Sequence, residues 1–188
     1  MTTNPTAQTP SDQSLTTERA DLVETLRRHR DFLRTTAAGL TDDQARTRST
    51  VSELTVGGLI KHVAQTERQW ATFMREGAGS APDIDWESID WSNPPAEIAA
   101  FQDSHRMLED ETLEALLAEY AQVGEETDWL VATLDLDTRY DLPKAPWFAP
   151  GQQWSVRRAA MHIVAETSQH AGHADIIREA IDGQKTMG

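Results

Sequence analysis

The stretch from residue 161 to residue 173 carries three histidines and one glutamate at helical spacing. The four residues follow one another at intervals of four, four and three positions: His162, Glu166, His170 and His173. On an α-helix, where successive residues are about 100° apart, their side chains fall within an arc of roughly 80°. Imidazole nitrogen and carboxylate oxygen are ligands that zinc and neighbouring transition metals favour. The spacing therefore indicates a metal site on one face of a helix.

A metal site needs ligands from more than one element, because a single helix face cannot surround an ion. Glu166 and His170 are one turn apart, so both can reach the same ion. His62 is the only histidine of an earlier amphipathic segment and would complete a set of three ligands if it points inward. Three protein ligands leave coordination positions for water or substrate, as in catalytic rather than structural sites.

Two other interpretations start from the same histidines and glutamate. One is a polar network in a helical core, which stays open. The other is a ferritin-like di-iron site, which requires Glu-x-x-His on two helices. This chain has Gln169 three residues after Glu166 and no second copy of the motif. The His-Glu-x-x-His pattern of zinc proteases is also absent.

Four amphipathic segments are expected to position these residues. Apolar residues recur at helical intervals over 16–38, 55–76, 112–134 and from Ser155 to just before Gly183, and Thr55 and Ser155 are expected to cap the second and fourth of these helices. The connections 77–111 and 135–151 are rich in Pro and Trp, and only 95–101 looks like a further short helix. No strand pattern competes. The expected fold is all-α, a four-helix bundle with a long crossover between the second and third helices.

Three further residues within these helices allow alternative interpretations. Gly57 and Gly58 each cost about 1 kcal/mol inside a helix. They indicate either the close approach of another backbone or a ligand, or a frayed helix start. His29 interrupts the apolar stripe of the first helix, and we expect an ordinary packed histidine with one hydrogen bond.

Composition narrows the classes of function. The 188 residues carry a net charge of −14 without a cluster of Lys and Arg, which argues against nucleic-acid binding. No run of about 18 apolar residues predicts a membrane span, and a cytoplasmic protein is expected.

We expect residues 1–15 to form a flexible arm and residues 16–188 to form the bundle. Cysteine is absent, so a sulfur nucleophile would have to arrive with a cosubstrate.

Three motifs make the chain resemble the DinB/YfiT superfamily, and most closely its actinobacterial branch, which is known mainly as a domain of unknown function. They are Leu54-Thr55-Val56-Gly57-Gly58-Leu59-Ile60-Lys61-His62, Glu67-Arg68-Gln69-Trp70, and the segment from Trp154-Ser155-Val156-Arg157-Arg158 through His170-Ala171-Gly172-His173-Ala174-Asp175-Ile176. The resemblance covers nearly all of the chain after residue 15. It implies a four-helix bundle with metal ligands at His62, Glu166 and His170. This His/Glu/His set is similar to that of the mycothiol-dependent maleylpyruvate isomerases, which bind zinc.

Two departures limit what the resemblance implies. Those isomerases carry a second, C-terminal domain that helps to complete their active site, whereas this chain ends soon after its fourth helix. Maleylpyruvate isomerisation is therefore not expected. The His-Arg-Gly-Gln sequence of other members reads His170-Ala171-Gly172-His173 here, without the arginine.

Several residues beside the ligands are candidates for supporting roles. We expect His162 and His173 to hold the ligands or the substrate by hydrogen bonds, with a fourth ligand or a general base as the alternative. Arg158 could hold a carboxylate of substrate or cosubstrate, or could simply be an exposed arginine at a helix start. Three aromatic residues nearby form either an apolar rim or ordinary packing: Trp147, Phe148 and Trp154.

The resemblance favours a metal-dependent enzyme that transfers a low-molecular-weight thiol such as mycothiol to an electrophilic substrate. The expected ion is zinc, with nickel or another transition metal as an alternative. Two other functions fit the residues: a hydrolase that uses metal-bound water, and a non-enzymatic, stress-related metal-binding protein. Residue chemistry alone does not decide among them or establish that the chain is an enzyme. A homodimer is a further expectation, because the aromatic loops and an apolar bundle face could pair.

Overall fold

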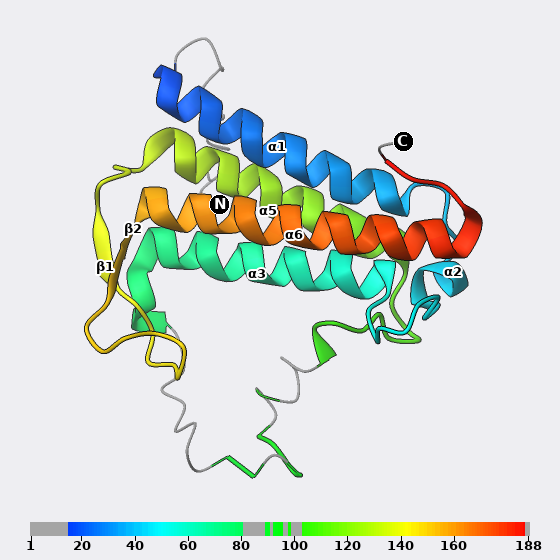
Figure 1. The fold of residues 1–188 in the computed structure, drawn as a ribbon. Coiled ribbons are helices and arrows are strands. Elements are labelled where there is room, and N and C mark those ends of the chain that lie inside the picture. Colours follow the sequence, from blue (N-terminus) through cyan, green and yellow to red (C-terminus); the bar gives the residue numbers. More distant parts are fainter. Residues whose placement is uncertain (1–14, 81–88, 91, 96–97, 99–102, 187–188) are drawn as a thin grey trace, which may run out of the picture.

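Four long helices lie side by side in the computed structural model, which describes residues 15–80, 89–90, 92–95, 98 and 103–186 (Figure 1). They are α1 (Thr17–Ala37), α3 (Val56–Glu76), α5 (Leu113–Thr133) and α6 (Val156–Asp182). Each lies within one residue of its predicted span. Helix α1 packs against α6 and α5, and α3 packs against the same two helices. The predicted all-α four-helix bundle is confirmed.

Helices α3 and α5 run in the same direction although they follow one another among the long helices (Figure 1). Arg68 pairs with Glu119 and Arg75 pairs with Glu126, so both helices advance by seven residues between contacts. Parallel consecutive helices require a connection that returns along the bundle, which confirms the predicted crossover. It begins with the 3₁₀ helix η2 (Gly77–Ser80). The crossover tryptophans, Trp86 and Trp91, and most of the predicted helix at 95–101 lie outside the described residues.

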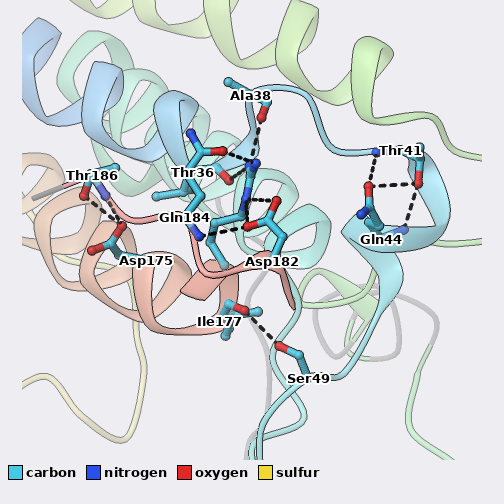
Figure 2. Close-up of polar contacts among 11 residues, drawn as sticks. Thr36, Ala38, Thr41, Gln44, Ser49, Asp175, Ile177, Asp182, Gln184 and Thr186 are labelled. Carbon is cyan, nitrogen blue, oxygen red and sulfur yellow. Dashed lines mark hydrogen bonds and ion pairs between the residues drawn. The ribbon is translucent and has the colours of Figure 1, made fainter. Parts of the chain in front are cut away.

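Side-chain caps explain why three of the long helices begin where they do. The hydroxyls of Thr55, Thr112 and Ser155 each accept a hydrogen bond from the backbone N–H three residues later. The predicted caps at Thr55 and Ser155 are therefore confirmed. Thr16 precedes α1 without a side-chain hydrogen bond. The short helix α2 (Asp42–Arg46) has a reciprocal capping box between Thr41 and Gln44 (Figure 2).

The expectation that the segment 135–151 is only a loop is wrong in part. An antiparallel hairpin of β1 (Arg139–Asp141) and β2 (Gln153–Ser155) closes this connection at one end of the bundle (Figure 1). Three-residue strands are too short to show an alternating pattern in the sequence. Tyr140 pairs with Trp154 across the hairpin, and β2 leads directly into α6. The hairpin thus fixes the start of α6, the helix that carries His162, Glu166, His170 and His173.

Arg178 anchors the other end of α6. Its Nη1 donates to the carbonyl oxygens of Thr36 and Ala38, each at 2.8 Å, and its Nε lies 2.9 Å from Asp182. These carbonyls belong to the end of α1, where backbone acceptors lack partners within the helix. Both ends of α6 are therefore held in place.

A buried ion network crosses the middle of the bundle. Arg30 on α1 lies 2.6 Å from Glu67 on α3 and 2.8 Å from Asp128 on α5. Burial acts to lower the pKa of Arg30, but the two carboxylates overcome this and raise it above its usual value. Gly124 leaves room for the guanidinium, because an added Cβ would lie 3.1 Å from Arg30 Cδ. Within the described part of the chain, no helix is long and apolar enough to cross a membrane.

Candidate metal centre

Helices α3 and α6 bring together His62, Glu166 and His170. Each offers one ligand atom, and the three atoms lie within 4.8 Å of one another. Glu166 Oε2 and His170 Nε2 are 3.6 Å apart. Ligand atoms around tetrahedral zinc are separated by about 3.5 Å, so small side-chain movements would let the three converge on one ion. The structure therefore contains a His/Glu/His group that could hold a metal ion.

His62 is the most buried member of this group. Its Nδ1 lies 3.3 Å from Ser104 Oγ, which leaves Nε2 as the nitrogen available to an ion. Burial, together with the nearby rings of His105 and His170, lowers the pKa of His62 to about 4. The imidazole is consequently neutral at physiological pH, as a metal ligand must be.

His162 and His173, the other two histidines of α6, contact the His/Glu/His group from either side. His162 Nε2 lies 3.7 Å from Glu166 Oε1, the carboxylate oxygen that does not face His170. His173 Nδ1 lies 3.5 Å from His170 Nδ1, on the opposite side of that ring from Glu166. Such contacts orient ligand side chains in metal sites. The structure thus places both residues beside the His/Glu/His group, and their supporting roles stay a prediction.

Sequence reasoning missed Ser104 and His105, which lie on the crossover. The ring of His105 stacks on that of His62, with centroids 3.7 Å apart. The carbonyl oxygen of His105 lies only 2.1 Å from the position of a Cβ added to Gly58. Close backbone approach is therefore the correct explanation of the glycine pair, and a frayed helix start is wrong. That pair was the one sequence feature indicating that another segment passes here.

Aromatic rings and Arg158 continue the site along α6 towards its N-terminus. Trp154 stacks on Trp70 at 4.7 Å, and the ring of His162 meets both tryptophans edge-on at 5.1 and 4.8 Å. The Cζ atom of Arg158 lies 4.1 Å from the ring centroid of Trp154. Phe148 packs edge-on against Trp154. Trp154 and Phe148 therefore pack in the apolar cluster at this end of the bundle.

His29 and Trp147 stand outside the group that could hold a metal. His29 Nδ1 lies 3.0 Å from Ser168 Oγ, so His29 is a packed histidine that joins α1 to α6, as predicted. Trp147 is 62% exposed near the hairpin. Neither residue belongs to the His/Glu/His group.

Comparisons with known proteins agree with this architecture. A family model described as mycothiol-S-transferase matches residues 21–183. Among solved structures, a conserved protein from Enterococcus faecalis superposes with a TM-score of 0.58 and 17% identity, covering 87% of this chain and 96% of that chain. At this identity the likeness shows the fold alone. A search of curated proteins found no match.

Proposed function

The chain belongs to the mycothiol S-transferase family, and from this premise we propose that it transfers a low-molecular-weight thiol of the mycothiol type to an electrophilic substrate. The match bears out the expected link to thiol chemistry at the level of the family. The narrower actinobacterial branch of the DinB/YfiT superfamily stays a prediction. We further propose that His62, Glu166 and His170 hold the metal ion that the reaction uses.

The observation that carries this proposal is the convergence of the three side chains from two helices while one side stays accessible. The Glu166 side chain is 29% exposed and that of His170 is 12% exposed. A thiol and an electrophile can therefore approach the group from solvent. A structural metal site would instead surround the ion with four protein ligands.

The donor set suits zinc, with nickel or another transition metal as the alternative, because two imidazoles and a carboxylate are typical ligands of these ions. A divalent ion bound there would lower the pKa of a thiol, so that thiolate is available at neutral pH. The nucleophilic sulfur comes from the cosubstrate, since the chain has no cysteine.

The protein's own residues hold this arrangement ready before substrates arrive. Burial lowers the pKa of His170 and of His162, although Glu166 partly opposes this, so both rings favour the neutral form. His162 and His173 restrict how Glu166 and His170 can rotate. Preorganised ligands of this kind reduce the cost of placing the reacting atoms.

The test is a conjugation assay with zinc-loaded protein, mycothiol and monobromobimane as the electrophile. We expect thiol-dependent turnover that is lost in His170→Ala and retained in His29→Ala. His29 is a matched control because it is a packed histidine whose ring is hydrogen-bonded to Ser168, outside the His/Glu/His group. Turnover that needs no thiol, or that His170→Ala leaves unchanged, would overturn the proposal.

A further inference from the structure

Arg158 has no carboxylate partner in the described part of the chain, although it is exposed on a strongly acidic protein. Its neighbour Arg157 pairs with both Glu18 and Asp137. The chain carries 31 acidic residues against 17 basic ones, so an exposed arginine has many carboxylates available to it. The Arg158 side chain packs over the ring of Trp154, and its positive charge acts to lower the pKa of the neighbouring His162. Its guanidinium N–H groups are therefore available to an anion from solvent.

Trp154 holds the Arg158 side chain in place. The guanidinium carbon lies 4.1 Å from the ring centroid of Trp154, a residue that is only 8% exposed and whose ring is itself stacked on Trp70. A guanidinium over an aromatic ring keeps its planar fork of N–H donors free to bind a carboxylate through two hydrogen bonds. Because the support is buried, Arg158 loses less side-chain freedom on binding than an unsupported arginine would.

Arg158 also lies in line with the residues that could hold a metal. Arg158, His162, Glu166 and His170 follow one another at intervals of four residues on α6. The rise of about 1.5 Å per residue puts the backbone of Arg158 about 12 Å from that of Glu166, and the long arginine side chain can close part of this distance. The ring of His162 lies between them and contacts both Trp154 and Glu166.

We propose that Arg158 binds the carboxylate of an organic-anion substrate whose reactive end lies at the His62–Glu166–His170 group. This inference rests on the proposed function and names its substrate class. The carboxylate belongs to the electrophile, because the cysteine carboxyl group of mycothiol forms an amide and is not free.

The first experiment measures binding and needs no turnover. The probes are 4-nitrobenzoate and its neutral methyl ester, titrated calorimetrically into zinc-loaded protein at low salt. We expect Arg158→Gln to weaken binding of the anion about fivefold, as for one ion pair near the surface, and to leave the ester unchanged. Arg34→Gln is the matched control, because Arg34 is also exposed and has no carboxylate partner within the described ranges. Arg158→Gln should fold normally, since only its backbone N–H serves the cap at Ser155.

The second experiment tests whether Arg158 binds the carboxylate of the electrophile during turnover. With mycothiol as the thiol, turnover of 4-chloro-3-nitrobenzoate is compared with that of its methyl ester. Arg158→Gln should raise KM about fivefold for the acid and leave KM for the ester unchanged. If no thiol is transferred at all, the proposed function fails while the binding experiment still tests Arg158. Equal affinity of Arg158→Gln and the unaltered protein for 4-nitrobenzoate would overturn the inference, because the carboxylate would then bind elsewhere.

Discussion

The ring of His105 stacks on the ring of His62, with centroids 3.7 Å apart and an angle of 24° between the planes. His62 lies on α3, whereas His105 lies on the crossover that leads to α5. Ser104 contacts Nδ1 of both rings, at 3.3 and 3.2 Å. The orientation of a proposed metal ligand therefore depends on how the crossover docks against α3.

Replacing His105 tests this dependence. His105→Ala removes the stacked ring and should lower the affinity for zinc about tenfold, as loss of a residue that orients a ligand does. His105→Phe keeps a flat ring against His62 and should retain most of the affinity. Competition with a chromophoric chelator measures both values. Equal affinities in the alanine variant and the unaltered protein would show that the stacking does not position His62.

Substitution of Gly58 tests the close approach of the crossover. A Cβ at this position would lie 2.1 Å from the carbonyl oxygen of His105, so Gly58→Ala must displace backbone. We expect the free energy of unfolding to fall by about 1–3 kcal/mol in urea titrations. Gly172→Ala is the control, since that helical glycine has nothing within 4 Å of an added Cβ and should gain up to about 1 kcal/mol. An unchanged stability of Gly58→Ala would mean that the crossover is not held against α3.

The buried ion network should make Glu67 important for stability. Glu67→Gln leaves Arg30 charged, buried and without one of its two carboxylates, so we expect a loss of about 3–5 kcal/mol in the free energy of unfolding. Glu119→Gln removes an exposed pair with Arg68 that joins α3 to α5, and should cost less than about 1 kcal/mol. Urea titrations of both variants make the comparison. Similar losses would argue that Arg30 does not depend on Glu67.

Protonation of the histidines should weaken the metal-free protein in mild acid. Burial lowers the pKa of His62 from 6.5 to about 4, so the unfolded chain takes up a proton first as the pH falls. Stability is therefore fully present above pH 6.5 and is lost as the pH falls towards 4. The lowered pKa values of His105, His162 and His170 act with the same sign.

Urea unfolding in the presence of a chelator at pH 7.5 and pH 5 measures this loss. After allowance for screening by solvent, His62 should account for about 1 kcal/mol of it. His62→Phe should therefore show a smaller fall than the unaltered protein. An identical fall in the two proteins would exclude His62 as a source of the pH dependence.

Local spacing was sufficient to predict the features that lie within one helix. The periodicity of His162, Glu166, His170 and His173 depends only on helix geometry, and the structure places all four in one row along α6, each near the next. The helix bounds followed similarly from apolar periodicity and from caps such as Thr55 and Ser155. These are local properties of the chain, which is why they could be predicted from the sequence alone.

Features that depend on distant segments could not be predicted in this way. Ser104 and His105 lie in an irregular connection, so no period indicated that they face His62. Arg30 and Glu67 resemble ordinary surface residues until it is known which helix faces pack together. The glycine pair, Gly57 and Gly58, did mark a close approach, but nothing in the sequence named the approaching segment.

The central claim is that His62, Glu166 and His170 bind one metal ion together, and X-ray absorption spectroscopy of the zinc-loaded protein tests it most directly. We predict one zinc per chain, with a first shell of two imidazole nitrogens and one carboxylate oxygen at about 2.0–2.2 Å and at least one further light atom. His62→Ala should reduce the imidazole count to one. A spectrum that His62→Ala leaves unchanged, or a protein that binds no stoichiometric zinc, would contradict the account.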